Sequence, residues 1–254
     1  MINSDPDCGS EVEVQEEPDL QFLSTSQPVD AFLAMLGNEM RNPLSALNGA
    51  LQRWEGSRHD PAQMDTLREV MQRQVRQLVR LSDDLLDLAR LKQGRMEIRR
   101  EPVELGELVR AAHDELRPYI EERGHTLLLS VPPEALVIHG DSSRLLQAIA
   151  NLIQNAAKFT ERNGALSVRL SVEDGMAAIR IHDNGRGIEE RMLKAIFEPL
   201  SPVDPIDASP EDGLGIGLRL VKAIVEHHGG SVTASSAGTG LGSEFVVRLP
   251  LIEA

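Results

Sequence analysis

Apolar side chains recur every three or four residues in two long segments near the start of the chain. The first segment contains Phe32, Leu36, Met40, Leu44, Leu47, Leu51 and Trp54. This spacing predicts an amphipathic helix over about residues 29–55. The second contains Met64, Leu67, Met71, Leu78, Leu81, Leu85, Leu88 and Leu91. It predicts a helix that starts at Asp60 and Pro61, which suit a cap and a first turn, and that ends near Gly94.

The short segment between these two predicted helices makes them antiparallel neighbours, so residues 29–95 are expected to form a helical hairpin. One hairpin alone buries its apolar stripes poorly. We therefore expect two copies to associate into a four-helix bundle, which would make the protein a homodimer.

Helix and strand patterns alternate from about residue 103 to residue 252. Helices are predicted over residues 105–122, 141–159, 189–196 and 217–228. Strands are predicted over residues 125–131, 135–139, 165–172, 176–182, 231–235 and 244–249. This mixed order predicts an α+β fold, an α/β sandwich in which helices cover one face of a mixed sheet.

Acidic residues outnumber basic ones by 40 to 26, which gives a formal net charge of −14. Residues 1–30 contain eight Asp or Glu and no Lys or Arg, so we expect residues 1–28 to be an acidic disordered tail or linker. Nucleic-acid binding is not expected, because it depends on Lys and Arg neutralising phosphates. No apolar run approaches the ~20 residues of a membrane span. The acidic start also lacks a secretory signal, and we expect a cytoplasmic protein.

Two glycine clusters are candidates for binding phosphate groups. DNGRG at 183–187 follows a predicted strand, and GLGIG at 213–217 leads directly into a predicted helix. Glycine lets the backbone approach a ligand closely, and the free N–H groups at a helix start attract anions. Neither cluster matches the P-loop or the dinucleotide-binding pattern. Each one alone also fits a flexible loop or a turn. The glycines are Gly185, Gly187, Gly213, Gly215 and Gly217.

Five motifs follow one another in the second half of the chain. They are DSSRLLQAIANLIQNAAKFT at 141–160, DNGRGI at 183–188, FEP at 197–199, GLGIGL at 213–218 and GSEF at 242–245. In this order they closely resemble the ATP-binding domain of sensor histidine kinases, a nucleotide fold shared with gyrase, HSP90 and MutL. Upstream, FLAMLGNEMRNPL at 32–44 is similar to the phosphoacceptor helix of that family, and LLDL at 85–88 matches its second helix.

This resemblance implies that the chain binds ATP and Mg²⁺. Asn155 would coordinate Mg²⁺ through its side-chain oxygen, and Asn151 would lie on the same face of the helix. Asp183 would accept a hydrogen bond from the adenine amino group, and Lys158 would lie near the phosphates. The alternative interpretation is that these residues are ordinary helix asparagines, a turn-capping aspartate and a solvated lysine at a helix end.

The position of the family's phosphoacceptor histidine is occupied by Asn38. An amide nitrogen donates its lone pair to the carbonyl and is not a usable nucleophile, so we predict no autophosphorylation at this position. By resemblance, Glu39 matches the general base, and Asn42 matches the residue that orients a hydrolytic water on the phosphoaspartate of a response-regulator receiver domain. One interpretation is that Glu39 and Asn42 support phosphatase activity. The other is that they are solvated helix residues beside Pro43.

The lid segment, residues 201–212, is a second departure from the family pattern. Family lids usually supply Lys or Arg to the γ-phosphate, whereas this segment contains Asp204, Asp207, Glu211 and Asp212 and no basic residue. Like charges oppose closure over a triphosphate. We therefore expect ATP binding without tight closure of the lid.

Several functions remain compatible with the sequence. The protein would dephosphorylate a receiver, or dock a receiver or a sibling histidine kinase without chemistry, or present ATP to a histidine of another subunit. A further interpretation is that Asn38 is an engineered substitution in an otherwise active sensor histidine kinase.

Overall fold

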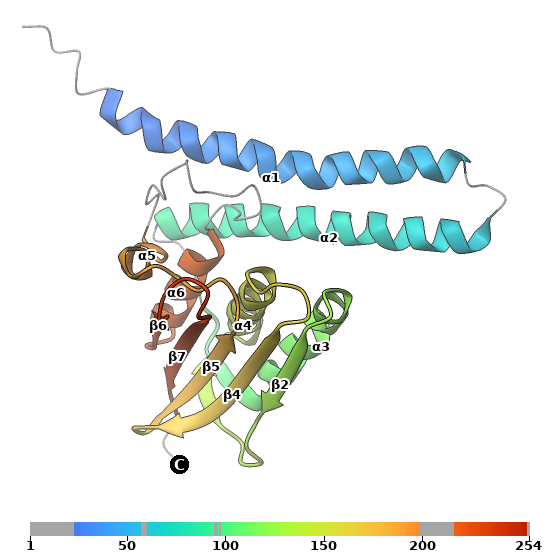
Figure 1. Ribbon diagram of the computed structural model, residues 1–254. Coiled ribbons are helices and arrows are strands. Elements are labelled where there is room, and N and C mark those ends of the chain that lie inside the picture. Colours follow the sequence, from blue (N-terminus) through green and yellow to red (C-terminus); the bar gives the residue numbers. More distant parts are fainter. Residues whose placement is uncertain (1–22, 57–59, 94–95, 97, 199–215, 253–254) are drawn as a thin grey trace, which may run out of the picture.

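The computed structural model describes residues 23–56, 60–93, 96, 98–198 and 216–252. Two long helices come first, α1 (Leu23–Gly56) and α2 (Pro61–Lys92), and they form an antiparallel hairpin (Figure 1). The remaining elements are β1 (Glu101–Glu104), α3 (Leu105–Glu122), β2 (Thr126–Ser130), β3 (Val137–Gly140), α4 (Ser142–Lys158), β4 (Ala165–Glu173), β5 (Met176–Asp183), α5 (Glu190–Ala195), α6 (Ile216–His227), β6 (Ser231–Ser235) and β7 (Ser243–Pro250). A helical hairpin followed by an α/β sandwich confirms the predicted fold class.

The predicted start of the second helix is confirmed by its capping contact, in which the backbone N–H of Gln63 donates to Asp60 Oδ1 at 3.2 Å. The first helix begins at Leu23, earlier than the predicted start at residue 29. Pro28 lies inside it, where the missing N–H forfeits a single hydrogen bond and does not end the helix. Among the described helices, none combines the length and the apolar character that crossing a membrane requires.

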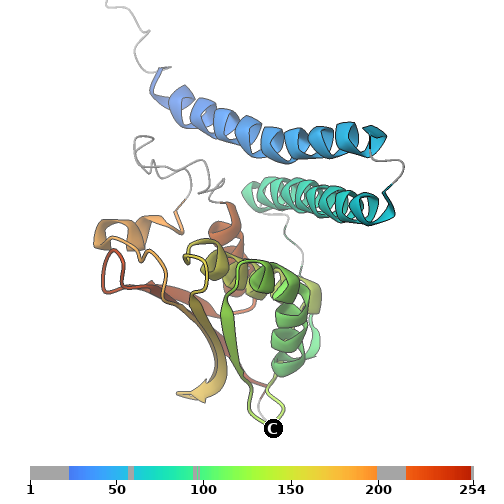
Figure 2. The same ribbon diagram turned by 45° about the vertical axis from the view of Figure 1, so that its right-hand side comes forward.

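The sheet of the sandwich has the strand order β2-β4-β5-β7-β6, in which β2 and β4 are parallel and the other pairs are antiparallel. Helices α3, α4 and α6 pack on one face of this sheet (Figure 2). A separate two-stranded sheet pairs β1 with β3, with Glu101 opposite Gly140. The sequence pattern did not predict β1, because Val103 is its only buried residue and its partner strand lies far along the chain.

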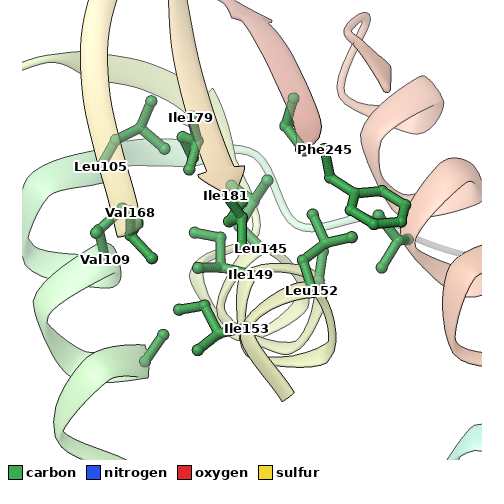
Figure 3. Close-up of a cluster of buried hydrophobic side chains, with 14 of the residues drawn as sticks. Leu105, Val109, Leu145, Ile149, Leu152, Ile153, Val168, Ile179, Ile181 and Phe245 are labelled. Atoms are coloured by element: carbon green, nitrogen blue, oxygen red, sulfur yellow. The ribbon is translucent and has the colours of Figure 1, made fainter. Parts of the chain in front are cut away.

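The core of the sandwich is aliphatic, as a chain with only 3% aromatic residues requires (Figure 3). Leu152 and Ile153 of α4 pack toward Val168 of β4 and Ile179 of β5, and all four are fully buried. Each such side chain contributes about 1.5–3 kcal/mol when removed from water. This burial fixes α4 against the sheet and leaves its other face available for polar contacts.

A buried histidine joins the C-terminal end of α6 to the start of α4. His228 Nε2 accepts the backbone N–H of Asp141 at 2.9 Å, and Nδ1 lies 2.7 Å from the carbonyl oxygen of Ile224. Since the backbone N–H can only donate, the neutral tautomer must carry its proton on Nδ1, which donates to Ile224. Burial lowers the pKa of His228 below its ordinary value of 6.5.

Replacing His228 with glutamine should reduce the pH dependence of stability. In wild type, His228 of the unfolded chain binds a proton at a higher pH than His228 of the folded chain, whose pKa is lowered. Its contribution is therefore fully present above about pH 6.5 and is lost as the pH falls toward the lowered pKa. The decline is up to about 1.4 kcal/mol per pH unit. Glutamine can still accept the Asp141 N–H but does not titrate, so urea unfolding of His228→Gln should show a shallower decline.

The matched control is His139→Gln, which removes an exposed histidine of β3 and should keep the wild-type pH dependence. An identical decline in wild type and His228→Gln would contradict this role for the imidazole.

Candidate functional site

Asp183, the last residue of β5, is a buried carboxylate at one end of the sheet, with 2% of its surface exposed. Its Oδ1 accepts the backbone N–H of Gly185 at 2.8 Å, and its Oδ2 accepts the hydroxyl of Ser243 at 2.5 Å. Ser243 is its register partner on β7. These two bonds fix the orientation of the carboxylate. Ser243 belongs to the GSEF motif, but its contact with Asp183 is a long-range one that the sequence did not predict.

The loop after Asp183 is held between the end of α4 and the turn before β7. A Cβ on Gly185 would lie 2.3 Å from the carbonyl oxygen of Phe159, and the backbone N–H of Arg186 donates to that same oxygen at 3.0 Å. Gly187 has φ +69°, and a Cβ there would lie 2.1 Å from the carbonyl oxygen of Gly238. Only glycine permits these approaches, so the predicted importance of Gly185 and Gly187 has a clear steric basis.

Asn151, Asn155 and Lys158 share the polar face of α4, and each is half-buried. Asn151 Nδ2 is one of two buried polar side-chain atoms without a hydrogen-bond partner among the described residues. It lies 3.7 Å from the position that a Cβ on Gly217 would take, at the start of α6. An unsatisfied donor beside a helix N-terminus suits an anionic ligand.

Two cations lie against the ring of Phe159 at the end of α4. Lys158 Nζ lies 5.3 Å from the ring centroid, and the guanidinium carbon of Arg186 lies 4.3 Å from it. These side chains bring positive charge to the junction between α4 and the loop of residues 183–187. Such an arrangement favours a negatively charged ligand.

The other predicted site residues are not part of this cluster. Asn38, Glu39 and Asn42 lie on α1, in the hairpin, with both asparagines exposed and Glu39 half-buried. Arg41 Nη1 donates to Asn38 Oδ1 at 2.8 Å. Gly213, Gly215 and the acidic lid lie outside the described residues.

Two family models match successive parts of the chain. "His Kinase A (phospho-acceptor) domain" matches residues 29–94, and "Histidine kinase-, DNA gyrase B-, and HSP90-like ATPase" matches residues 140–253. The chain therefore belongs to the sensor histidine kinase family, with a helical hairpin and an ATP-binding domain in the family's order.

Known proteins similar to most of this chain support this assignment. The probable sensor histidine kinase TcrY of Mycobacterium tuberculosis is 34% identical over 88% of this chain and 46% of TcrY. The autoinducer 2 sensor kinase/phosphatase LuxQ of Vibrio cholerae is 32% identical over 95% of this chain and 29% of LuxQ. The crystal structure of full-length ShkA in complex with AMPPNP matches with a TM-score of 0.61 and 25% identity over 92% of this chain and 46% of ShkA. The chain spans less than half the length of each of these relatives.

Replacing Ser243 with alanine should weaken nucleotide binding without unfolding the domain. The hydroxyl orients the Asp183 carboxylate, which we expect to receive adenine, and loss of one such hydrogen bond corresponds to about a fivefold to tenfold higher Kd for ADP. Isothermal titration calorimetry measures the change. Ser243→Thr keeps the hydroxyl and should bind like wild type. An unchanged Kd in Ser243→Ala would contradict this role.

Proposed function

We propose that the chain binds ATP with Mg²⁺ between α4, the loop of residues 183–187 and the start of α6. The buried Asp183 carboxylate accepts the adenine amino group, which selects the base. The Asn151 amide and the backbone at Gly217 face the phosphates, and Lys158 contributes positive charge. The unsatisfied Asn151 donor is the observation that best supports a ligand here.

The residues present also fit Mg²⁺. Among the described residues, no group of three or more His, Cys, Asp and Glu could hold a metal ion by themselves. Asn155 would provide one hard oxygen ligand, while phosphate and water oxygens complete the shell that Mg²⁺ prefers. The bound ion would supply neutralisation of phosphate charge.

We further propose that the protein does not phosphorylate itself at position 38. Asn38 is exposed on α1, and its carboxamide oxygen accepts a hydrogen bond from Arg41. Its amide nitrogen has no lone pair available for in-line attack on phosphorus. The residue can therefore contact a partner but cannot carry a phosphoryl group.

Replacing Asn38 with histidine tests this proposal directly. Wild type incubated with γ-labelled ATP and Mg²⁺ should show no acid-labile label on the hairpin, because the amide is not nucleophilic. Asn38→His should gain label at least about tenfold above the wild-type level, since imidazole supplies the missing nucleophile. Asn38→Ala is the control and should stay unlabelled. Acid-labile label on the wild-type hairpin would refute the proposal.

The function best supported by the hairpin is dephosphorylation of a response-regulator receiver. Asn42 lies about one helical turn after Asn38 on the same face of α1, and Glu39 neighbours Asn42 at a spacing of three residues. Asn42 would orient a water whose oxygen bonds to phosphorus as the bond to the aspartyl oxygen breaks, and Glu39 would accept the water proton. This releases inorganic phosphate and the free aspartate. LuxQ, a relative of this chain, is itself named a sensor kinase/phosphatase.

Mutating Asn42 should separate catalysis from docking. Receivers phosphorylated by a small-molecule donor should lose phosphate faster with wild type present, and Asn42→Ala should reduce this acceleration by about tenfold to a hundredfold, because the water is no longer positioned. Asn48→Ala, a change at another exposed asparagine of α1, should keep it. If wild type accelerates decay in no receiver, the phosphatase proposal fails.

The exposed apolar side chains of the hairpin support a homodimer. They are Leu33, Met40, Leu44, Leu51, Val75, Val79 and Leu86. A second hairpin would cover them in a four-helix bundle, as proposed from the sequence. A sibling histidine kinase with a similar hairpin would fit the same surface. We also propose that the protein acts in the cytoplasm, as expected from the sequence.

A non-catalytic scaffold remains a second candidate, since Asn38, Glu39 and Asn42 also form a polar docking surface. The native gene at codon 38 would show whether the asparagine is natural or replaces a histidine in an active kinase. A kinase acting in trans would label the histidine of a mixed-dimer partner and would need Asn155 and Asp183 of this chain.

A further inference from the structure

Four side chains join the end of α2 to the start of α4. Arg144 Nη1 of α4 donates to Asp87 Oδ2 of α2, and to Gln147 Oε1 at 3.0 Å. Gln147 Nε2 lies 3.2 Å from both Asp84 Oδ1 and Asp87 Oδ2. The Asp87 side chain is only 3% exposed. We call Asp84, Asp87, Arg144 and Gln147 the interdomain cluster, because they connect the hairpin to the ATP-binding domain.

Negative charge is concentrated in this cluster. Asp83 adds a third carboxylate from α2, while Arg80 and Arg90 of α2 add positive charge, Arg90 at 3.5 Å from Asp87. Burial raises the pKa of Asp84 from 3.8 to about 6; Asp87 and Asp83 also raise it, whereas Gln147 and Arg80 oppose the shift. Helix α6 also packs on α2 and carries Arg219 and Lys222, the latter 3.8 Å from Glu198.

The other polar contacts between the hairpin and the sandwich are weaker. Arg73 pairs with Glu122 at 2.9 Å and Arg80 with Glu115 at 3.8 Å, and all four side chains are about half-exposed. Such pairs contribute little to docking. Leu91 packs against the sandwich core, but this apolar contact does not respond to pH. The pH dependence of docking therefore resides mainly in the interdomain cluster.

The interdomain cluster lies on the face of α4 that carries the candidate nucleotide residues. Arg144, Gln147, Asn151, Asn155 and Lys158 are spaced by three, four, four and three residues, which places them in one stripe. Since the opposite face of α4 is buried against the sheet, α4 moves with the whole domain. Docking at the start of α4 thus sets the direction in which the nucleotide residues face the hairpin.

We propose that Asp84, Asp87, Arg144 and Gln147 form a proton-sensitive latch that holds the ATP-binding domain against the hairpin. Protonated Asp84 lies beside the Asp87 carboxyl without charge repulsion, while Arg144 pairs with Asp87. When Asp84 ionises, its charge lies beside the carboxylates of Asp87 and Asp83, and the docked arrangement becomes less favourable. The latch adds a regulatory contact to the proposed function and does not require bound nucleotide.

The direction in which docking changes with pH follows from the docked and released states of Asp84. Its carboxyl holds its proton more tightly when docked, with a pKa of about 6, than when released, with a pKa near 3.8. The contribution of Asp84 to docking is therefore fully present below about pH 4 and is lost as the pH rises through about 6. The full shift corresponds to about a hundredfold change in the docking equilibrium. Since water partly screens Asp84, we expect on the order of tenfold.

Energy transfer between two dyes tests the latch in the full chain without nucleotide. Dyes on Gln77→Cys of α2 and Leu128→Cys of β2 report docking, because both positions are exposed and lie in different domains. Cys8→Ser removes the native thiol. Diluting labelled chains into unlabelled ones keeps each dye pair within one chain. The docked fraction should fall as the pH rises through about 6.

Matched variants test whether Asp84 causes the pH dependence of docking. Asp84→Asn is neutral at every pH and should stay docked throughout, whereas Asp65→Asn, at an exposed aspartate of α2 outside the cluster, should titrate like wild type. Arg144→Gln removes the arginine of the ATP-binding domain that pairs with buried Asp87, leaves Asp87 paired with Arg90 of its own helix, and should lower docking at every pH. A wild-type docked fraction that does not change with pH, or an Asp84→Asn variant that titrates like wild type, overturns the proposal. Calorimetry of ADP binding tests the proposed nucleotide function separately.

Discussion

The burial of one face of α4 against the sheet is the constraint on which the rest of the molecule depends. Leu145, Leu152 and Ile153 are almost inaccessible to solvent, so α4 cannot rotate or slide without opening the core. Its polar face is therefore fixed as well. Side chains along that face keep a set order, from Arg144 near the hairpin to Lys158 at the far end. Contacts with the hairpin and with a ligand are both made on one rigid helix.

The nucleotide site depends on pairs of residues that are distant in sequence. Asp183 takes its partner from β7, and Gly185 takes its position from Phe159 at the end of α4. Asn38 lies outside this framework, exposed on α1. A change at position 38 therefore leaves the packing of the sandwich undisturbed. This separation is the physical reason why a change at position 38 would leave the proposed nucleotide site intact.

Apolar periodicity was sufficient to predict the hairpin and most elements of the sandwich, because each buries one regular face. Helix ends were harder: Pro28 does not stop α1. Strand β1 was missed because its stability comes from pairing with β3 and not from a local pattern. The resemblance identified Asp183 and Asn151, but Ser243 and the partners of Asp87 could be recognised only in the folded chain. The dimer and the roles of individual site residues stay predictions.

The position of β7 in the sheet has a consequence for biosynthesis. This strand is inserted between β5 and β6, although it is made last among the described strands. In a nascent chain, β4 and β5 leave the ribosome before Ser243 and Phe245 of β7 have been synthesised. Until then β5 lacks its β7 partner, and Asp183 lacks the Ser243 residue opposite it. The antiparallel hairpin can pair locally much earlier, since its contacts are close in sequence. The helical hairpin can thus form early in translation, whereas the proposed nucleotide site is completed only after β7 has been synthesised.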